Sequence, residues 1–300
     1  MTRALVLGGG GPVGIAWEAG LLAGLAEGGV HLAHADHIVG TSAGSFVGSQ
    51  IAMGKSPSDM AQAIIAEANR PRPAPPPVDG RPAEAAAAPN LSVLFQKMQE
   101  AAAGTRDPQE VRREIGAFAL AAQTVDEETF IRGFGRSLSQ DQADAWPERG
   151  FACTAVDAET GEFVVWDAGK RVGLARAVAS SCSVPGVFPP ITLGGRRYLD
   201  GGMRSPTNAD LVKGHERVVV VAVRIGGGDP EMAARMRAPL EREIKALTES
   251  GSRVELVTPD DASATAFGVN LMDARVRPAA CRAGLDQGRG LAGALAGFWN

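Results

Sequence analysis

One segment of the chain, Gly40-Thr41-Ser42-Ala43-Gly44, places a serine between two glycines. The apolar run 37–39 precedes it and a helical pattern follows, which puts Ser42 on a turn between a strand and a helix. Because Gly40 and Gly44 have no Cβ, the chain can turn sharply there and expose the serine hydroxyl, as a nucleophile elbow requires. The first amides of the helix would face negative charge that develops beside Ser42. The same residues also fit a glycine-rich turn in which Ser42 only caps a helix.

A second glycine-rich segment, residues 8–14, follows the apolar run 4–7 and precedes another helical pattern. Its spacing includes G-x-G-x-x-G, which a dinucleotide site would use together with an acidic residue at the end of the next strand. Asp36 instead lies before that strand, which argues against a dinucleotide site. Consecutive glycine amides can alternatively bind one oxyanion. Because Pro12 has no N–H, the expected donors are the amides of Gly9, Gly10 and Gly11.

A serine nucleophile needs a base, and Asp200 is a candidate because it follows a short strand and precedes Gly201 and Gly202. An ordinary aspartate, with a pKa of about 3.9, is a poor base for a hydroxyl. Burial in an apolar environment would raise that pKa and make the carboxylate more basic. The segment is also compatible with a simple Asp-Gly turn in a hairpin.

The four histidines are weaker candidates for the base. His31, His34 and His37 lie before the strand that leads to Ser42, at the end of that strand away from the serine. Their spacing is only a weak metal-binding pattern. His215 follows Ser42 in the chain, as a hydrolase histidine would, but it also comes before its strand.

Strand and helix patterns alternate along the chain, which predicts an α/β fold with helices on both faces of a sheet. The expected strands are 4–7, 37–39, 151–156, 162–166, 197–199, 218–223 and 253–257. Residues 54–140 form an expected helical insertion between early and late strands. Seven of the nineteen prolines fall in 70–89, which predicts an extended loop or flap. The stretch after the last strand has a helical pattern interrupted by glycines.

Composition excludes several classes of protein. The 300 residues are 45% hydrophobic and 21% charged, which is typical of globular chains and not of disordered ones. A net charge of −4 argues against nucleic-acid binding but leaves transient contact with a membrane surface possible. The chain contains no apolar run of eighteen residues, so no transmembrane segment is expected. Three widely spaced cysteines form no metal or disulfide pattern and fit a reducing, cytoplasmic compartment.

The glycine-rich loop, the Ser42 segment and Asp200-Gly201-Gly202 resemble the patatin-like phospholipases in order and spacing. A fourth segment, residues 179–190, is similar to the A-S-x-x-x-P-x-x-F-x-P pattern of that family. The resemblance covers residues 3–53 and about 150–225. It implies a three-layer α/β/α sandwich with a central, mostly parallel sheet. One domain would span 1–300, with a flap and helical insertion at about 70–140 and a helical segment at about 258–300.

The resemblance also implies a function, namely serine acyl hydrolysis by a Ser42–Asp200 dyad without a catalytic histidine. The oxyanion hole would lie at Gly9 to Gly11, and neither a metal nor a cofactor is required. The expected substrate is a lipid or another apolar acyl ester, with residues 70–140 forming a lid or acyl pocket. Val13 replaces the arginine or lysine usual in the family, which predicts weaker selection for a charged head group. The alternatives are an inactive lipid-binding or partner-binding scaffold and, less favoured, a dinucleotide-dependent oxidoreductase.

Overall fold

The computed structural model describes residues 1–69, 94, 96–97, 100, 104, 106–137, 144–223 and 230–300. The described strands form one sheet in the order β5-β6-β3-β2-β1-β7-β8, with β4 paired to β3. Its parallel part consists of β1 (Arg3–Leu7), β2 (His37–Gly40), β3 (Gly150–Asp157), β7 (Arg217–Val221) and β8 (Arg253–Val257). The antiparallel strands are β4 (Phe163–Trp166), β5 (Ile191–Leu193) and β6 (Arg196–Asp200).

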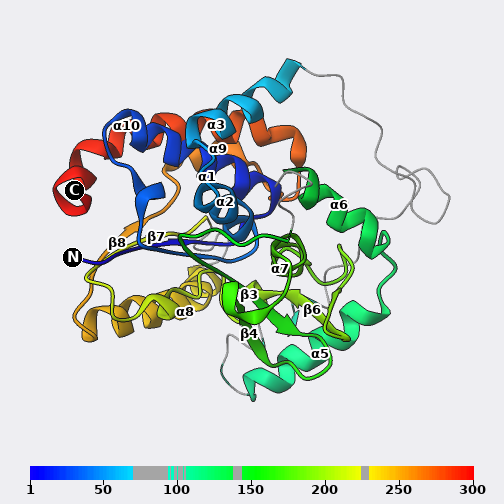
Figure 1. Cartoon of the computed structure of the whole chain (residues 1–300). Helices are drawn as coiled ribbons and strands as arrows, with labels where there is room; N and C mark the ends of the chain where they lie inside the picture. Colours follow the sequence, from blue (N-terminus) through cyan, green and yellow to red (C-terminus); the bar gives the residue numbers. More distant parts are fainter. Residues whose placement is uncertain are drawn as a thin grey trace.

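Helices cover both faces of this sheet (Figure 1). Successive residues of a strand point to opposite faces, and in the central strands the residues on both faces are apolar. Leu5 and Leu7 pack into the cluster formed with α1 (Gly11–Glu27), α2 (Ala43–Ala52), α7 (Leu174–Ser181) and α10 (Arg277–Trp299). Val6, the residue between them, faces the opposite layer and α8 (Pro230–Glu249). The fold is therefore the expected α/β/α sandwich with a mostly parallel sheet. α8 continues through Pro239 without a break.

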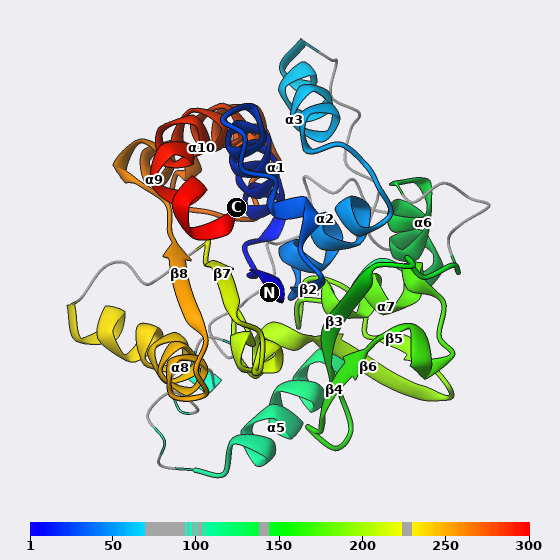
Figure 2. The ribbon, with the colours of Figure 1, turned by 60° about the vertical axis from the view of Figure 1, so that its left-hand side comes forward.

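The insertion between β2 and β3 contributes helices to both layers. It contains α3 (Pro57–Ile65), α5 (Pro108–Ala121) and α6 (Glu127–Ser137), which confirms the helical pattern in these parts of 54–140. α5 packs through Ala119 on the same face of the sheet as α8. α6 lies on the other side, next to α7 (Figures 1 and 2). The proline-rich segment 70–89, with Leu91 and Met98, lies outside the described residues.

The C-terminal helix α10 packs closely along α1, and α9 (Asp261–Phe267) lies beside it (Figure 2). Five of the glycines that interrupt the C-terminal pattern lie inside α10, and two of them, Gly284 and Gly288, form this contact. A Cβ on Gly288 would lie 2.4 Å from the Leu21 carbonyl oxygen, and one on Gly20 would lie 2.0 Å from that of Cys281. We call this contact, made by Gly20, Gly24, Gly284 and Gly288, the glycine seam. None of the described helices is long and apolar enough to cross a membrane.

Candidate active site

Ser42 and Asp200 reach the same edge of the sheet because of its strand register. Gly40, at the end of β2, pairs with Cys153 of β3. Asp200, at the end of β6, pairs with Ala155 of the same strand, only two residues farther along. β6 runs antiparallel to β3, yet its last residue still lies at the carboxyl end of the parallel strands. The two predicted catalytic residues, 158 positions apart in the chain, are thereby brought together.

The turn at Ser42 has the strained backbone of a nucleophile elbow. Ser42 has φ 53° and ψ −116°, a left-handed value that is rare for residues other than glycine. Both flanking glycines are required by close packing. A Cβ on Gly40 would lie 2.4 Å from the Gly44 carbonyl oxygen, and one on Gly44 would lie 2.0 Å from that of Leu7. The two glycines therefore allow β1, β2 and α2 to meet at the serine.

Residues 179–190, the fourth segment of the family pattern, hold the backbone of this turn. The amide of Ser42 donates to the Ser181 hydroxyl at 3.0 Å. The Ser42 carbonyl accepts from the Cys182 thiol at 3.1 Å and from the Ser45 hydroxyl at 2.6 Å, and also from the backbone amides of Ser45 and Phe46. The backbone N–H and C=O of Ser42 thus both have hydrogen-bond partners within the protein.

Asp200 is buried, with 2% of its surface exposed, and lies beside Ser42. Its carboxylate accepts a hydrogen bond from the Gly202 amide at 2.7 Å, and the Ser42 side chain lies close enough to lower the pKa of the carboxyl. Burial raises the pKa of the Asp200 carboxyl to about 7, and its interactions with the Ser42 side chain and the Gly202 amide keep that pKa from rising further. The carboxylate is therefore much more basic than an exposed aspartate but still ionised to a useful extent at neutral pH.

The glycine-rich loop lies against Ser42, since a Cβ on Gly9 would be 3.3 Å from the Ser42 Cβ. The expectation that Gly9 donates to an oxyanion needs correction, because its amide already donates to the Pro206 carbonyl at 2.8 Å. Within the described residues, the amides of Gly10, Gly11 and Ala43 have no acceptor. All three stand at helix starts, where amides have no partner in their own helix. These are the groups that can bind an anion beside the nucleophile.

Comparison with known proteins places these features in a family. The model of a family described as patatin-like phospholipase matches residues 5–213, which include Ser42, Asp200 and the glycine-rich loop. The chain belongs to this family. No curated protein matches its sequence.

Comparison with solved structures finds VipD and ExoU among the similar chains. VipD from Legionella pneumophila is 14% identical, with a TM-score of 0.47; the match covers 98% of this chain and 67% of VipD. The type III effector protein ExoU is 16% identical, with a TM-score of 0.37, over 96% of this chain and 53% of ExoU. In a structure of ExoU with SpcU from Pseudomonas aeruginosa, the matched chain is 16% identical, with a TM-score of 0.35. The match covers 96% of this chain and 52% of that chain. The patatin-like chain thus spans about half the length of ExoU.

The histidines of this patatin-like protein lie away from the nucleophile. His37 is the first residue of β2, whereas Ser42 follows the last. The His37 ring stacks on that of His215 at a centroid distance of 5.6 Å, so both belong to the opposite edge of the sheet. The Nδ1 atom of His215 is bonded to the Val212 carbonyl at 2.8 Å. Neither ring can take a proton from Ser42 in this arrangement.

A C-terminal segment beyond the family match covers the glycine-rich loop. The amide of Val13 donates to the Leu271 carbonyl at 3.2 Å. A Cβ on Gly11 would lie 2.8 Å from the same oxygen and 2.9 Å from the Met272 sulfur. Sequence reasoning missed Leu271 and Met272, because no motif marks them and only the folded chain brings them to the loop.

Val13 is fully buried in the core. A cationic group nonetheless lies near the start of α1, because the Arg277 guanidinium donates to the Pro12 carbonyl at 3.3 Å. Arg277 is also paired with Glu67 through two hydrogen bonds of 3.0 Å. Its charge is therefore already neutralised by a carboxylate.

A group of partly exposed aromatic side chains lies one helical turn beyond Ser42. Phe46 follows the serine by four residues and packs on Phe134 of α6, with ring centroids 5.7 Å apart. Phe130, also on α6, stacks on Phe188 at 4.4 Å. The insertion thus supplies two of the four rings of an apolar surface close to the nucleophile.

Proposed function

We propose that this patatin-like protein hydrolyses acyl esters through Ser42 and Asp200. The observation that carries the proposal is the buried Asp200 carboxylate of raised pKa, which the strand register places beside the Ser42 side chain. A group with a pKa near 7 is well matched to accept a hydroxyl proton at neutral pH. The strained turn and the unpaired amides next to Ser42 support the same assignment.

The proposed reaction has two acyl-transfer steps. Asp200 takes the proton of the Ser42 hydroxyl while the serine oxygen attacks the ester carbonyl, and Asp200 then protonates the departing alcohol. Water next loses a proton to Asp200 and attacks the acyl-enzyme; the bond from the acyl carbon to the Ser42 oxygen breaks, the acid leaves, and Asp200 returns the proton to the serine oxygen. The amides of Gly10, Gly11 and Ala43 are the proposed oxyanion donors, in place of the set that included Gly9. No metal or cofactor takes part in this scheme.

We propose lipid acyl esters as the substrate class, with the acyl chain on the aromatic surface formed by Phe46, Phe130, Phe134 and Phe188. Each additional CH₂ buried there would contribute up to about 0.8 kcal/mol, so activity should rise with chain length until the surface is covered. The buried Val13 and the neutralised Arg277 support the hydrolysis of neutral esters at rates at least comparable to phospholipids. Matched-chain monoacylglycerol and phospholipid, compared by kcat/KM, test this. A preference for phospholipid above about a hundredfold would contradict it.

Covalent labelling decides between an enzyme and an inactive lipid-binding or partner-binding scaffold. A fluorophosphonate should label the wild-type protein at Ser42, and Ser42→Ala should abolish both labelling and p-nitrophenyl butyrate hydrolysis. Asp200→Asn should lower the rate by about 10²–10⁴, the usual contribution of a positioned base. His215→Ala is the control and should retain the wild-type rate. A folded wild-type protein that is neither labelled nor active would support the scaffold.

A further inference from the structure

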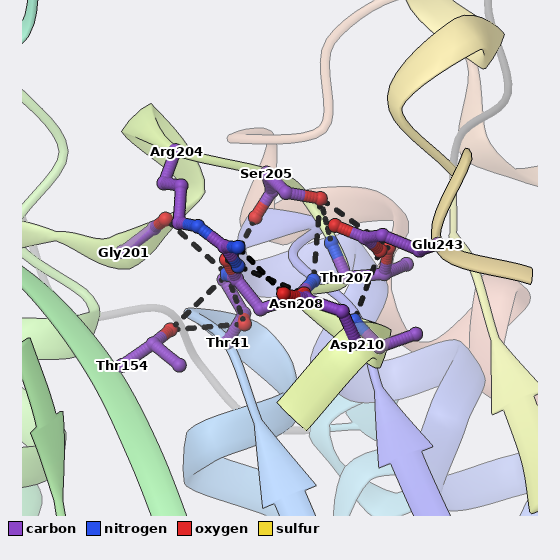
Figure 3. A network of polar contacts seen from close by, with 10 residues as sticks. Thr41, Thr154, Gly201, Arg204, Ser205, Thr207, Asn208, Asp210 and Glu243 are labelled. Carbon is purple, nitrogen blue, oxygen red and sulfur yellow. Dashed lines mark hydrogen bonds and ion pairs between the residues drawn. The ribbon is translucent and has the colours of Figure 1, made fainter. Parts of the chain in front are cut away.

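A buried polar network connects the nucleophile turn to the loop that carries Asp200 (Figure 3). Its centre is Asn208, which is fully buried and has a left-handed φ of 50°, a conformation in which asparagine is favoured over most residues. No sequence motif considered above includes this residue. Its side chain, however, contacts three separate parts of the active-site edge.

The Asn208 amide nitrogen donates to groups that lie directly next to the two reacting residues. It lies 3.0 Å from the hydroxyl of Thr41, the residue before Ser42. It lies 3.3 Å from the carbonyl of Gly201, the residue after Asp200. The side-chain amide of Asn208 therefore links the residue before Ser42 to the residue after Asp200.

Further bonds fix the amide in this position. The same nitrogen donates to the Ser205 carbonyl at 2.7 Å and lies 3.4 Å from the hydroxyl of Thr154, which itself is 3.0 Å from that of Thr41. The side-chain oxygen of Asn208 accepts from Arg204 at 2.9 Å, and Arg204 is paired with Asp210. Both ends of the amide are satisfied, so its orientation is defined by its partners.

The network also extends to the layer of helices below the sheet. A carboxylate oxygen of Glu243, on α8, accepts from the Thr207 hydroxyl at 2.6 Å and from the Ala209 amide at 2.9 Å. The loop around Asn208 is thereby bonded to Glu243 of α8 as well as to Thr41, which follows the end of β2.

We propose that Asn208 is a positioning residue that sets the separation and orientation of the Ser42 hydroxyl and the Asp200 carboxylate. The proposal rests on the Ser42–Asp200 function proposed above. Asn208 touches neither reacting group and acts through Thr41 and Gly201. Because a displacement of about 1 Å in a catalytic geometry can cost about 10² in rate, loss of this connection should lower kcat more than it changes KM.

The sharpest test changes one hydroxyl. Thr41→Val removes the acceptor on the nucleophile turn at nearly constant volume, whereas Thr41→Ser retains it. Thr41→Val should lower kcat about tenfold, with KM within twofold of the wild-type value. Thr41→Ser should retain most of the wild-type kcat. Fluorophosphonate labelling of Ser42 should slow in parallel with kcat. The pH at which activity falls on the acidic side should not move, because Asp200 stays buried.

Asn208→Asp removes the donor itself and should lower kcat about a hundredfold. Gln287→Glu is the matched control, since Gln287 joins Trp17, Ser263 and Thr258 by comparable bonds far from Ser42. It should lower the melting temperature but leave kcat unchanged. If Asn208→Asp does not fold, the Thr41 pair alone decides.

The outcomes separate the two proposals. Folded Thr41→Val with kcat within twofold of wild type, or an equal loss in Thr41→Ser, would overturn the positioning role while the hydrolase function stands. A wild-type protein that is neither labelled nor active would overturn the hydrolase function and the positioning role together.

Discussion

The amide of Ser42 donates a hydrogen bond of 3.0 Å to the hydroxyl of Ser181, a residue 139 positions later in the chain. Ser181 is the last residue of α7, and the thiol of the next residue, Cys182, donates to the carbonyl of Ser42. α7 thus holds a backbone conformation that would otherwise relax, since a left-handed residue other than glycine costs on the order of 1–3 kcal/mol.

Removing the Ser181 hydroxyl should therefore impair catalysis. In Ser181→Ala the strained turn loses one of its supports, and we expect kcat for p-nitrophenyl butyrate to fall about tenfold. Ser180→Ala is the matched control, because that buried hydroxyl bonds to Trp166 and Ala177 instead. It should reduce thermal stability without reducing kcat. Equal kcat losses in the two variants would show that Ser181 has no specific role at the turn.

The pH dependence of hydrolysis should report the burial of Asp200. The base is active only when ionised, and burial raises its pKa to about 7. The value of kcat/KM should thus fall tenfold per pH unit below about pH 7 and level off above it. Initial rates from pH 5 to 9, followed at a wavelength independent of nitrophenol ionisation, measure this. An activity that is constant down to pH 5 would mean that the base is an ordinary, exposed carboxylate.

Glu18 should make the folded protein less stable as the pH rises. Its carboxyl is fully buried in α1, both oxygens lack a hydrogen-bond partner among the described residues, and burial raises its pKa well above the ordinary value. Above about pH 4.3 the unfolded chain ionises this group while the folded chain keeps it protonated, so the free energy of unfolding decreases with pH.

Glu18→Gln removes this contribution. Its free energy of unfolding, relative to wild type, should increase between pH 5 and pH 8 by up to about 1.4 kcal/mol per pH unit. Urea titrations at both pH values provide the measurement. Asp200 is present in both proteins, so its own titration cancels. A difference that is the same at both pH values would show that Glu18 does not change its protonation on folding.

The glycine seam predicts opposite effects for two substitutions on one helix. Gly288→Ala places a methyl group against the Leu21 carbonyl and should destabilise the protein by about 1–3 kcal/mol. In Gly293→Ala the new Cβ has no heavy atom of the described residues within 4 Å, so the substitution should stabilise α10 by about 0.5–1 kcal/mol. Thermal melts of the two variants test the pair. The same sign for both would mean that helix propensity, not packing against α1, determines the effect.

Local patterns predicted the parts of the fold that depend on local chemistry. Apolar runs located β1, β2, β7 and β8, and glycine spacing located the turn at Ser42. The three-residue strand β5 was missed because Ile191–Leu193 is too short to show an alternation. The fold class and the family followed from the order of four motifs.

The remaining features of the site depend on contacts between distant segments. That Gly9 already donates to Pro206 follows only from the path of the chain after β6. Asn208 has no recognisable motif, because its role comes from the strands that surround it rather than from its neighbours in sequence. The aromatic surface likewise needs Phe130 and Phe188 from separate segments. The sequence predicted Ser42 and Asp200 as the reacting residues, and the folded chain shows which residues surround them.

The contact between α1 and α10 also has a consequence for the order in which the protein is made. Residues 20–24 leave the ribosome more than 250 positions before residues 284–288, their partners across the seam. Until then, an apolar face of the helix that begins at the glycine-rich loop has no cover from α10. Such a face favours association with other chains or with chaperones. The contact between α1 and α10 can therefore form only after synthesis has passed residue 288.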